Sequence, residues 1–450
     1  MPTKLTLLCG LLAGQTFYAH AAGKVPTFNK DVQPIIASRC ASCHRSGEIG
    51  PMEFSSYAKV RPWAKSIKQN VLSRRMPPWF ADPHYGKFSN DRAMPQNEID
   101  TLVQWADGGA PEGAAKDRRP QPTFVDGWNI PQPDLVIQAP KPFEVPKEGK
   151  VDYQYIVLPT GLTEDKWVEM VEARPTDRTI VHHIVIFARD PQSNWLRGEA
   201  EPGVAFVPPR INKDGKPRSD IGGGGNEILT IYTPGNLPDR WKPGQAKLVR
   251  AGSDLVMQLH YTPNGKAATT DRTRVGMVFA KQPPTERVMT LTTSNDRFAI
   301  PPGDANYQVE GRPARMPQQA TLMSFFPHMH LRGKAFQYRV KMPGKESEIL
   351  LSVPKYDFNW QLTYRLEQPL MLPPGAQIES SAWFDNSPNN PFNPDPKDTV
   401  RFGEQSWEEM MIGFFDISFD AKISRNDFFR RPAPVPAPGA SKPATTGGAQ

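Results

Sequence analysis

The sequence predicts a multidomain chain, with a small all-α domain followed by two all-β antiparallel sandwich domains of the jelly-roll type. Helical periodicity occurs before residue 113, whereas short alternating apolar runs dominate from residue 134 onward. The chain contains 49 Pro and 34 Gly, which favour short strands joined by turns. A length of 450 residues with 10% aromatic side chains is sufficient for several apolar cores.

The N-terminus has the pattern of a secretory signal peptide over residues 1–21. Lys4 precedes a short apolar run from Leu5 to Phe17, and Ala19-His20-Ala21 forms a small-residue cleavage site. This run is too short for a stable transmembrane helix, so we expect a periplasmic or secreted protein with no stable membrane insertion after cleavage. The net charge of +7 is spread without a Lys/Arg block, which argues against a nucleic-acid partner.

The segment Cys40-Ala41-Ser42-Cys43-His44 has the C-x-x-C-H spacing. Two thiols at this spacing can form thioethers to the haem vinyl groups, and the histidine that follows lies under the iron. A redox dithiol needs no following histidine, and a zinc site needs two more ligands close by, which are absent here. The sequence therefore predicts one covalent haem c, bound through Cys40, Cys43 and His44.

Two helical patterns flank this motif. Asp31 to Arg39 leads into it, and Asn97 to Ala106 carries apolar residues at amphipathic spacing before Gly108-Gly109 ends the helix. Residues 23–112 resemble a small class I cytochrome c. Residues 113–133 are Pro-rich and polar and are predicted to be a linker.

The sixth ligand of the haem iron is expected to be a thioether or an imidazole. Met76 is the preferred candidate because the two prolines after it stiffen the loop that would present its sulfur. The alternatives are Met94, Met52 and His84.

Strand-like alternation runs through residues 134–430, and the length suggests two sandwiches, at 134–292 and 293–430, with a boundary near 285–300. The predicted strands are Tyr153 to Leu158, Trp167 to Ala173, Ile180 to Ala188, Leu255 to Tyr261, Arg274 to Phe279, Ala320 to Phe326, Gln337 to Val340, Gln361 to Arg365 and Gln377 to Phe384. Residues 431–450 are rich in Pro, Ala and Gly and are predicted to be a disordered tail.

Five histidines fall on predicted strands or strand ends: His182, His183, His260, His328 and His330. Residues at i and i+2 of a strand face the same side, so His328 and His330 can reach one metal ion. His182 and His183 can share an ion only if their strand ends or bulges there. Three imidazoles suit copper or zinc, but a blue-copper centre is excluded because residues 134–450 contain no Cys.

With these histidines, the chain resembles the type II copper, ascorbate-dependent monooxygenases, of which peptidylglycine α-hydroxylating monooxygenase and dopamine β-monooxygenase are members. Four segments carry the resemblance, in the order of that family: Val181 to Phe187, Gln258 to Tyr261, His328 to Lys334, and Glu408 to Met411. The resemblance implies two coppers per chain. An electron-transferring copper would be held by His182, His183 and His260, and an oxygen-binding copper by His328, His330 and Met410. Met411 is the alternative sulfur.

The sequence departs from this family in three respects. The disulfides of the animal enzymes are absent, Phe326 replaces an Arg that binds a peptide carboxylate, and Phe414 replaces a Tyr that contacts the peptide. These changes argue against glycine-extended peptides and leave the small-molecule substrate open.

The sequence thus predicts a copper-dependent monooxygenase that hydroxylates a C–H bond with O2. Electrons would pass through the haem from a periplasmic donor, with ascorbate as another candidate reductant. The alternative is a non-enzymatic periplasmic electron-transfer cytochrome with a copper-binding or partner-binding β module.

Overall fold

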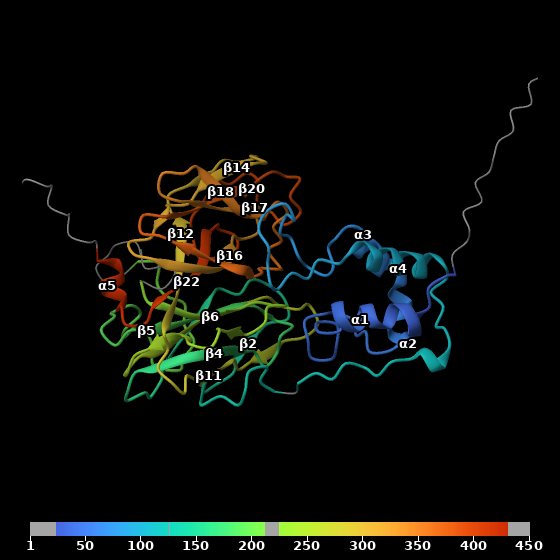
Figure 1. The fold of residues 1–450 in the computed structure, drawn as a ribbon, viewed down its shortest axis with the longest axis horizontal. Helices are drawn as coiled ribbons and strands as arrows, with labels where there is room; N and C mark the ends of the chain where they lie inside the picture. The colour runs from blue at the N-terminus through green and yellow to red at the C-terminus, as the bar shows by residue number, and fades with distance from the viewer. Residues whose placement is uncertain (1–23, 126, 212–224, 431–450) are drawn as a thin grey trace, which may run out of the picture.

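The computed structural model describes residues 24–125, 127–211 and 225–430. The predicted signal peptide and C-terminal tail lie outside these residues. Figure 1 shows a small helical body, formed by the N-terminal segment, beside a larger β body in which the C-terminal half lies against the middle of the chain. Among the described helices, none is long and apolar enough to cross a membrane.

The helical body consists of short helices around one apolar core. Their bounds are η1 (Phe28–Val32), α1 (Gln33–Arg39), α2 (Tyr57–Val60), η2 (Arg61–Trp63), α3 (Ala64–Leu72), α4 (Gln96–Asp107) and η3 (Ala115–Asp117). Both predicted helices are present, the first as η1 followed by α1 and the second as α4. In α4, Ile99, Leu102 and Trp105 are buried on one face, as the helical spacing of these residues requires. The Trp105 Nε1 donates to Pro111 O at 3.1 Å, which satisfies its buried N–H.

The regular elements in the rest of the described chain are almost all strands. Their bounds are β1 (Leu135–Gln138), β2 (Phe143–Val145), β3 (Gln154–Pro159), β4 (Lys166–Arg174), β5 (Val181–Arg189), β6 (Glu227–Tyr232), β7 (Asp239–Arg240), β8 (Gln245–Val249), β9 (Asp254–Tyr261), β10 (Thr269–Asp271), β11 (Arg274–Phe279), β12 (Glu286–Asn295), β13 (Ala299–Ile300), β14 (Tyr307–Glu310), β15 (Ala314–Arg315), β16 (Ala320–His328), β17 (Gly333–Lys341), β18 (Ser347–Val353), β19 (Tyr364–Leu372), β20 (Gln377–Phe384), β21 (Val400–Arg401) and β22 (Met411–Asp420). A short helix α5 (Arg425–Phe429) follows. The strand predicted at Gln361 to Arg365 is wrong in position, because β19 begins only at Tyr364.

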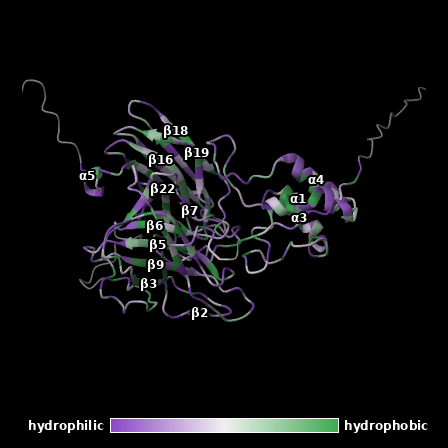
Figure 2. Ribbon diagram, turned by 60° about the horizontal axis from the view of Figure 1, so that its bottom comes forward, coloured by the Kyte–Doolittle hydropathy of each residue, from purple (hydrophilic) through white to green (hydrophobic). Residues whose placement is uncertain are grey.

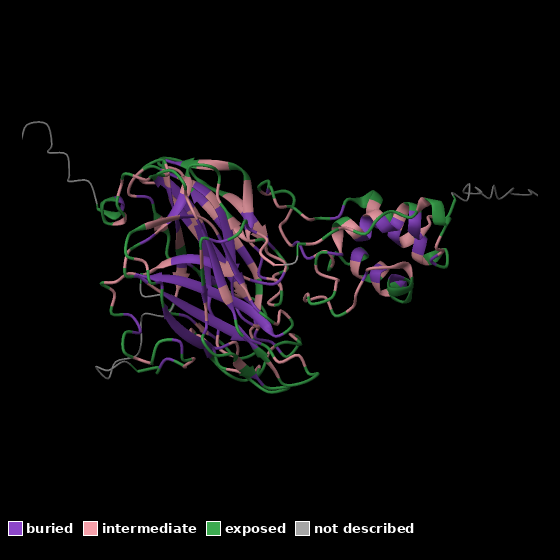
Figure 3. Cartoon of the chain, turned by 90° about the horizontal axis from the view of Figure 1, so that it is seen from below, coloured by how far each residue is buried: buried purple, intermediate pink, exposed green. Residues whose placement is uncertain are grey.

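The β body contains several sheets, in agreement with the β-rich prediction. A long sheet runs β1-β11-β4-β8-β12-β22-β16-β19, a second runs β3-β9-β5-β6, and a third runs β14-β20-β17-β18. One apolar core combines β4 and β11 of the long sheet with β3, β5 and β9, and another combines β16 and β22 with β17 and β20. This layering is compatible with β-sandwich domains. Apolar and buried residues concentrate along these strands (Figures 2 and 3).

The long sheet is continuous through the predicted domain boundary. Strand β12 pairs in parallel with β8 through Glu286 and Arg287, and pairs antiparallel with β22 along its whole length. A further apolar cluster joins β3, β5, β6 and β9 to Phe326 of β16 and to Met410, Ile412 and Phe414 at β22. The two halves of the β body are therefore packed closely against each other, and this interface positions the candidate site.

The segment between Trp79 and Arg92 leaves the helical body and packs on the β body. Trp79 and Phe88 contact Tyr364, with ring centroids 4.9 and 5.7 Å apart, and belong to the second β core. The Asp82 main-chain N–H donates to Ser352 O at 2.8 Å. This part of the predicted 23–112 domain thus anchors the helical body to the C-terminal half of the β body.

Candidate metal centre

Five buried histidines converge where the two halves of the β body meet. The ring centroids of His182 and His260 lie 4.7 Å apart, and those of His183 and His260 lie 4.9 Å apart. The second group is directly adjacent, since His183 and His328 lie 5.4 Å apart and His328 and His330 lie 5.2 Å apart. The structure therefore brings both predicted histidine groups into one continuous cluster (hereafter the histidine cluster).

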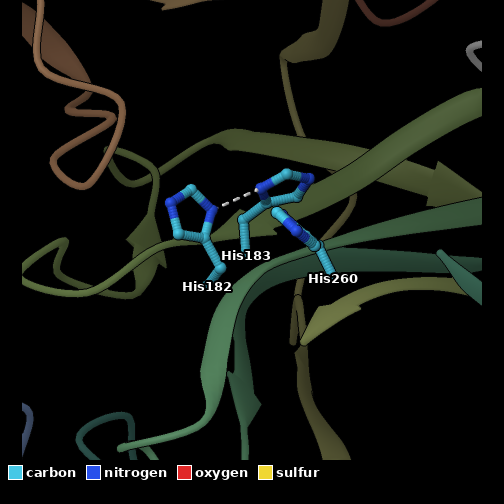
Figure 4. A group of neighbouring side chains, drawn as sticks. All are labelled: His182, His183 and His260. Atoms are coloured by element: carbon cyan, nitrogen blue, oxygen red, sulfur yellow. Dashed lines mark hydrogen bonds between the residues drawn. The ribbon is translucent and has the colours of Figure 1, made fainter. Parts of the chain in front are cut away.

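The first group, His182, His183 and His260, comes from two paired strands. The register of β5 against β9 shifts between Val181 and His183, and His183 then faces His260. This irregularity turns both members of the doublet toward the same side, as the sequence predicted. One nitrogen from each of the three rings lies within 4.8 Å of the others, and Figure 4 shows the rings converging.

The nitrogens of this group fit a metal ion. The Nδ1 atoms of His182 and His183 are 3.1 Å apart, close to the roughly 3.3 Å that separates two ligands of a tetrahedral ion. His182 Nε2 and His260 Nδ1 are buried without a hydrogen-bond partner in the described chain. The other nitrogen of His260, Nε2, lies 3.0 Å from Ser406 Oγ, so Nδ1 is the one left for a metal.

The second pair, His328 and His330, is positioned differently. Strand β16 ends at His328, so His330 lies beyond the strand. The prediction that the two rings face the same side because both residues lie on one strand is therefore wrong in its stated reason. His328 Nδ1 lies 2.7 Å from Gln361 Oε1, and His330 Nδ1 lies 3.2 Å from Glu408 O. These partners fix both rings and leave His328 Nε2 for a metal, whereas His330 Nε2 lies 3.5 Å from the Tyr153 hydroxyl and would give up that contact to bind one.

Glu409 holds the chain at this strand end. Its two carboxyl oxygens accept main-chain N–H bonds from His330 at 2.8 Å and Arg332 at 2.6 Å. Burial raises the pKa of Glu409 to about 8, against the opposing effect of these donors. The carboxyl group therefore fixes the backbone conformation that presents His330.

Burial keeps the cluster uncharged. It lowers the pKa of His182 to about 3 and that of His328 to about 4. Burial, and then the neighbouring histidines, hold the pKa values of His183, His260 and His330 well below the ordinary value. All five rings are therefore neutral at pH 7, which is the form that binds a metal.

Two aromatic side chains enclose the cluster. The Tyr153 ring lies 4.3 Å from that of His260 and 5.4 Å from that of His183, and its hydroxyl is 3.5 Å from His330 Nε2. Phe358 stacks on His182, with ring centroids 4.2 Å apart and planes 24° apart. Tyr153 thus touches both histidine groups, and Phe358 covers one side of the first.

Met410, the sulfur ligand that the resemblance implied, lies at the same small cavity as His328. It is buried and lines a small cavity of about 20 Å³ together with His183 and His328. The apolar part of the wall includes Val185, Phe187, Ile231, Phe326, Ile412 and Phe414. Met411 does not line this cavity and packs in the second β core. Of the two candidate sulfur ligands, Met410 therefore lies at the cavity that His328 lines, and Met411 does not.

A second, larger cavity of about 600 Å³ surrounds the C-x-x-C-H motif. Cys40, Cys43 and His44 line it, and both cysteines are free thiols. Burial raises the pKa of the Cys40 thiol to about 12, so it is protonated at neutral pH. His44 Nδ1 lies 3.2 Å from Met52 O, which leaves Nε2 for another partner, and Gly50 permits this approach because a Cβ there would lie 2.7 Å from Nδ1.

Three of the four candidate sixth ligands, Met52, Met76 and Met94, also line this cavity. His84 does not, and its exposed ring pairs with Asp82 at 2.7 Å. The β body closes the cavity with side chains that include Arg178 and Trp360. Arg178 is paired with Glu48 of the helical body at 2.7 Å.

Sequence reasoning missed several residues of the site, chiefly Tyr153, Phe358, Gln361 and Glu409. Glu409 lies inside the Glu408 to Met411 segment that carries the resemblance, and an acidic residue directly before a buried apolar strand was a usable signal. No sequence pattern marked the other three, which reach the site only through the packing of distant strands.

No family model matches the chain, and no curated protein matches it. Solved structures align at low similarity. The structure of infectious bursal disease virus strain Gx is 9% identical, with a TM-score of 0.21 over 67% of this chain and 77% of the other. A putative alpha-L-fucosidase from Bacteroides ovatus is 12% identical, with a TM-score of 0.15 over 72% of this chain and 43% of the other. These scores are too low to support an inference about fold or function.

Proposed function

We propose that this protein is an exported, copper-dependent monooxygenase that hydroxylates a C–H bond with O2. The observation that carries the proposal is the cluster of five buried, neutral histidines beside Met410 and an apolar cavity. Two coppers per chain fit this set, one at His182, His183 and His260 and one at His328, His330 and Met410. A thioether favours Cu(I), and imidazoles suit copper in either oxidation state.

Copper supplies the one-electron steps by which O2 is reduced while the substrate is oxidised. Each turnover takes up O2, two electrons and two protons with the substrate, and gives the alcohol and water. The chain itself orients the ligands, since Gln361 and Glu408 O fix the rings of His328 and His330. Tyr153 and Phe358 exclude water from the cluster, which prevents unproductive reactions.

The cavity wall supports an apolar substrate. Phe326 and Phe414 line it, with ring centroids 5.9 Å apart, at the positions where the peptide enzymes carry polar contacts. A volume of about 20 Å³ has room for about one water-sized molecule such as O2. A substrate must therefore enter by displacing side chains at the interface of the two β halves.

The larger cavity supports a covalent haem c. Its volume of about 600 Å³ falls within the usual range of about 300–1,000 Å³ for cofactor and ligand sites. Cys40 and Cys43 would form the thioethers, His44 Nε2 would bind the iron, and Met76 is the proposed sixth ligand. Arg92 and Arg178 put two guanidinium groups on the wall, which suit the haem carboxylates. The haem would deliver electrons singly from a periplasmic donor.

Metal and haem content provide the first test. We expect the purified protein to contain two coppers and one covalent haem per chain, and to form alcohol in equal amount to O2 consumed when given a reductant and an apolar substrate from a panel. A His44→Ala variant should retain copper, but it should lose turnover with an electron-donor protein.

Two results would overturn the proposal. One structural zinc in place of two coppers would leave no centre for O2 chemistry. Copper and haem in full amount with no O2 uptake on any substrate would instead favour the non-enzymatic electron-transfer alternative.

A further inference from the structure

One turn of the chain reaches both cavities. Residues Phe358 to Gln361 belong to the connection from β18 to β19, and they lie between the helical body and the histidine cluster. Trp360 lines the cavity of the C-x-x-C-H motif, whereas the next residue, Gln361, bonds His328 Nδ1 at 2.7 Å. Phe358, two residues before Trp360, stacks on His182 at 4.2 Å.

This turn is held firmly at the junction of the two bodies. Gln361 O accepts bonds from Thr233 Oγ1 at 2.6 Å and from Asn236 Nδ2 at 3.2 Å. The Trp360 indole packs at Gly235, where a Cβ would lie 3.4 Å from the ring, and Arg92 of the helical body donates to Gly235 O at 2.5 Å. The indole thus has a fixed position on the wall that faces the helical body.

We propose that Trp360 is the residue through which electrons pass from the haem to the histidine cluster. The inference rests on the proposed function, because it requires both a haem and copper. The path from the indole crosses one peptide link, the Gln361 side chain and one hydrogen bond before it reaches His328. A second branch leaves the same turn through the Phe358 ring to His182.

The step transfers one electron without forming or breaking a bond. With both groups bound, the haem iron would be oxidised from ferrous to ferric and the copper reduced from cupric to cuprous, and no proton would have to move. Electron tunnelling is faster across short covalent and hydrogen-bonded paths with few gaps, and aromatic rings shorten such paths. The competing route, from Arg178 along the backbone to His182, passes through the saturated chain of the three residues between them.

The experiment measures electron transfer inside the protein, in the absence of O2 and substrate. A light pulse with a photoreductant reduces the haem of the cupric protein, and the decay of the ferrous haem absorbance gives the rate. We expect Trp360→Leu to slow this decay at least tenfold and Trp360→Phe, which keeps a ring, to slow it less. The haem spectrum, haem reduction potential and copper EPR signal should stay as in the wild type.

Asn359→Ala provides the matched control. Asn359 is exposed in the same turn, and its side chain bonds only Asp357 within the described chain. We expect its rate to lie within twofold of the wild type.

An unchanged rate in Trp360→Leu, with haem and copper intact, would overturn this inference alone. Wild-type protein that holds no haem or no copper would overturn the proposed function and this inference together. A tenfold loss in Asn359→Ala as well would show that the turn matters only as a scaffold, which also contradicts a specific role for the indole.

Discussion

The two histidine groups reach the same cluster by different structural means. In the first group, an irregularity in the β5–β9 pairing turns His182 and His183 to one side, and His260 keeps an unpartnered Nδ1. In the second, His328 ends a strand and His330 lies beyond it, and each Nδ1 is held by an oxygen. The first group therefore relies on strand pairing for its geometry, whereas the second relies on polar partners from other segments.

This difference predicts which residues should affect each of the two proposed copper sites. Changes in β5 or β9 should alter the first site with little effect on the second. Changes at Gln361, Glu409 or Met410 should do the reverse, although His183 and His328 are only 5.4 Å apart.

The largest expected effect comes from removing each group separately. His182→Ala with His183→Ala should reduce the copper content from two per chain to one, and His328→Ala with His330→Ala should remove the other copper. Each ion loses two of its three ligands, so binding should fall by more than 100-fold. Metal analysis and EPR provide the measurement, with circular dichroism to confirm folding.

Where a double variant does not fold, His260→Gln and His330→Gln replace it. The interpretation of two distinct sites would be wrong if any one of these changes removed both coppers, since a shared centre would then be indicated.

Acid should destabilise the metal-free protein. The folded-state pKa values of the histidines lie below the ordinary 6.5, so the unfolded chain binds more protons as the pH falls, and stability is lost between about pH 6.5 and 3. The shift of His328 alone corresponds to roughly 3 kcal/mol. Glu409 acts oppositely, because its raised pKa makes the folded state gain stability as the pH falls from 8 to 4.5.

Urea unfolding of the metal-free protein at pH 7 and pH 4.5 measures the change in the free energy of unfolding. We expect a net loss of stability at pH 4.5, because the effect of the histidines should exceed the opposite effect of Glu409. The variant that lacks His182 and His183 should lose less stability on acidification than the wild type. An equal loss in both would show that these buried rings do not control the acid response.

Part of this site follows from the sequence, and part does not. The strand irregularity at His182–His183 was predictable because neighbours on a regular strand face opposite sides. The proximity of the two groups was not, because it depends on how β5 packs against β16, far along the chain. The strand predicted from Gln361 failed because this residue turns to bond His328, and a polar contact of that kind leaves no periodic signal.

The helical body shows the same limit. The helices α1 and α4 were predicted from the sequence, whereas α3, which is longer than α1, was not. The packing of Trp79 and Phe88 against Tyr364 was not predicted, because aromatic residues in a loop give no indication of which distant core they join.

Glu409→Gln tests the polar support of the second group. An amide has only one oxygen, so one of the N–H groups of His330 and Arg332 would face an NH2 group. We expect a loss of about 1–3 kcal/mol in the free energy of unfolding, together with an altered EPR signal from the second copper only. Denaturant unfolding and EPR provide the measurements.

Glu408→Gln is the control, because the Glu408 side chain pairs with the exposed Arg210 and accepts a single main-chain N–H, from Gln405 at 3.1 Å, so the loss should be about 1 kcal/mol. A larger loss at Glu408 than at Glu409 would contradict the assignment of Glu409 as the residue that holds the strand end.

The smallest effect should come from Met410→Leu, which keeps an apolar side chain of similar size but removes the thioether. The first group has no sulfur, so only the second site should change, with Cu(I) affinity falling about tenfold because one soft ligand of three is lost. Competition with a Cu(I) chelator measures the affinity. Met411→Leu is the matched control, since Met411 packs in the second β core. If Met411→Leu weakened Cu(I) binding and Met410→Leu did not, Met411 would replace Met410 as the proposed sulfur ligand.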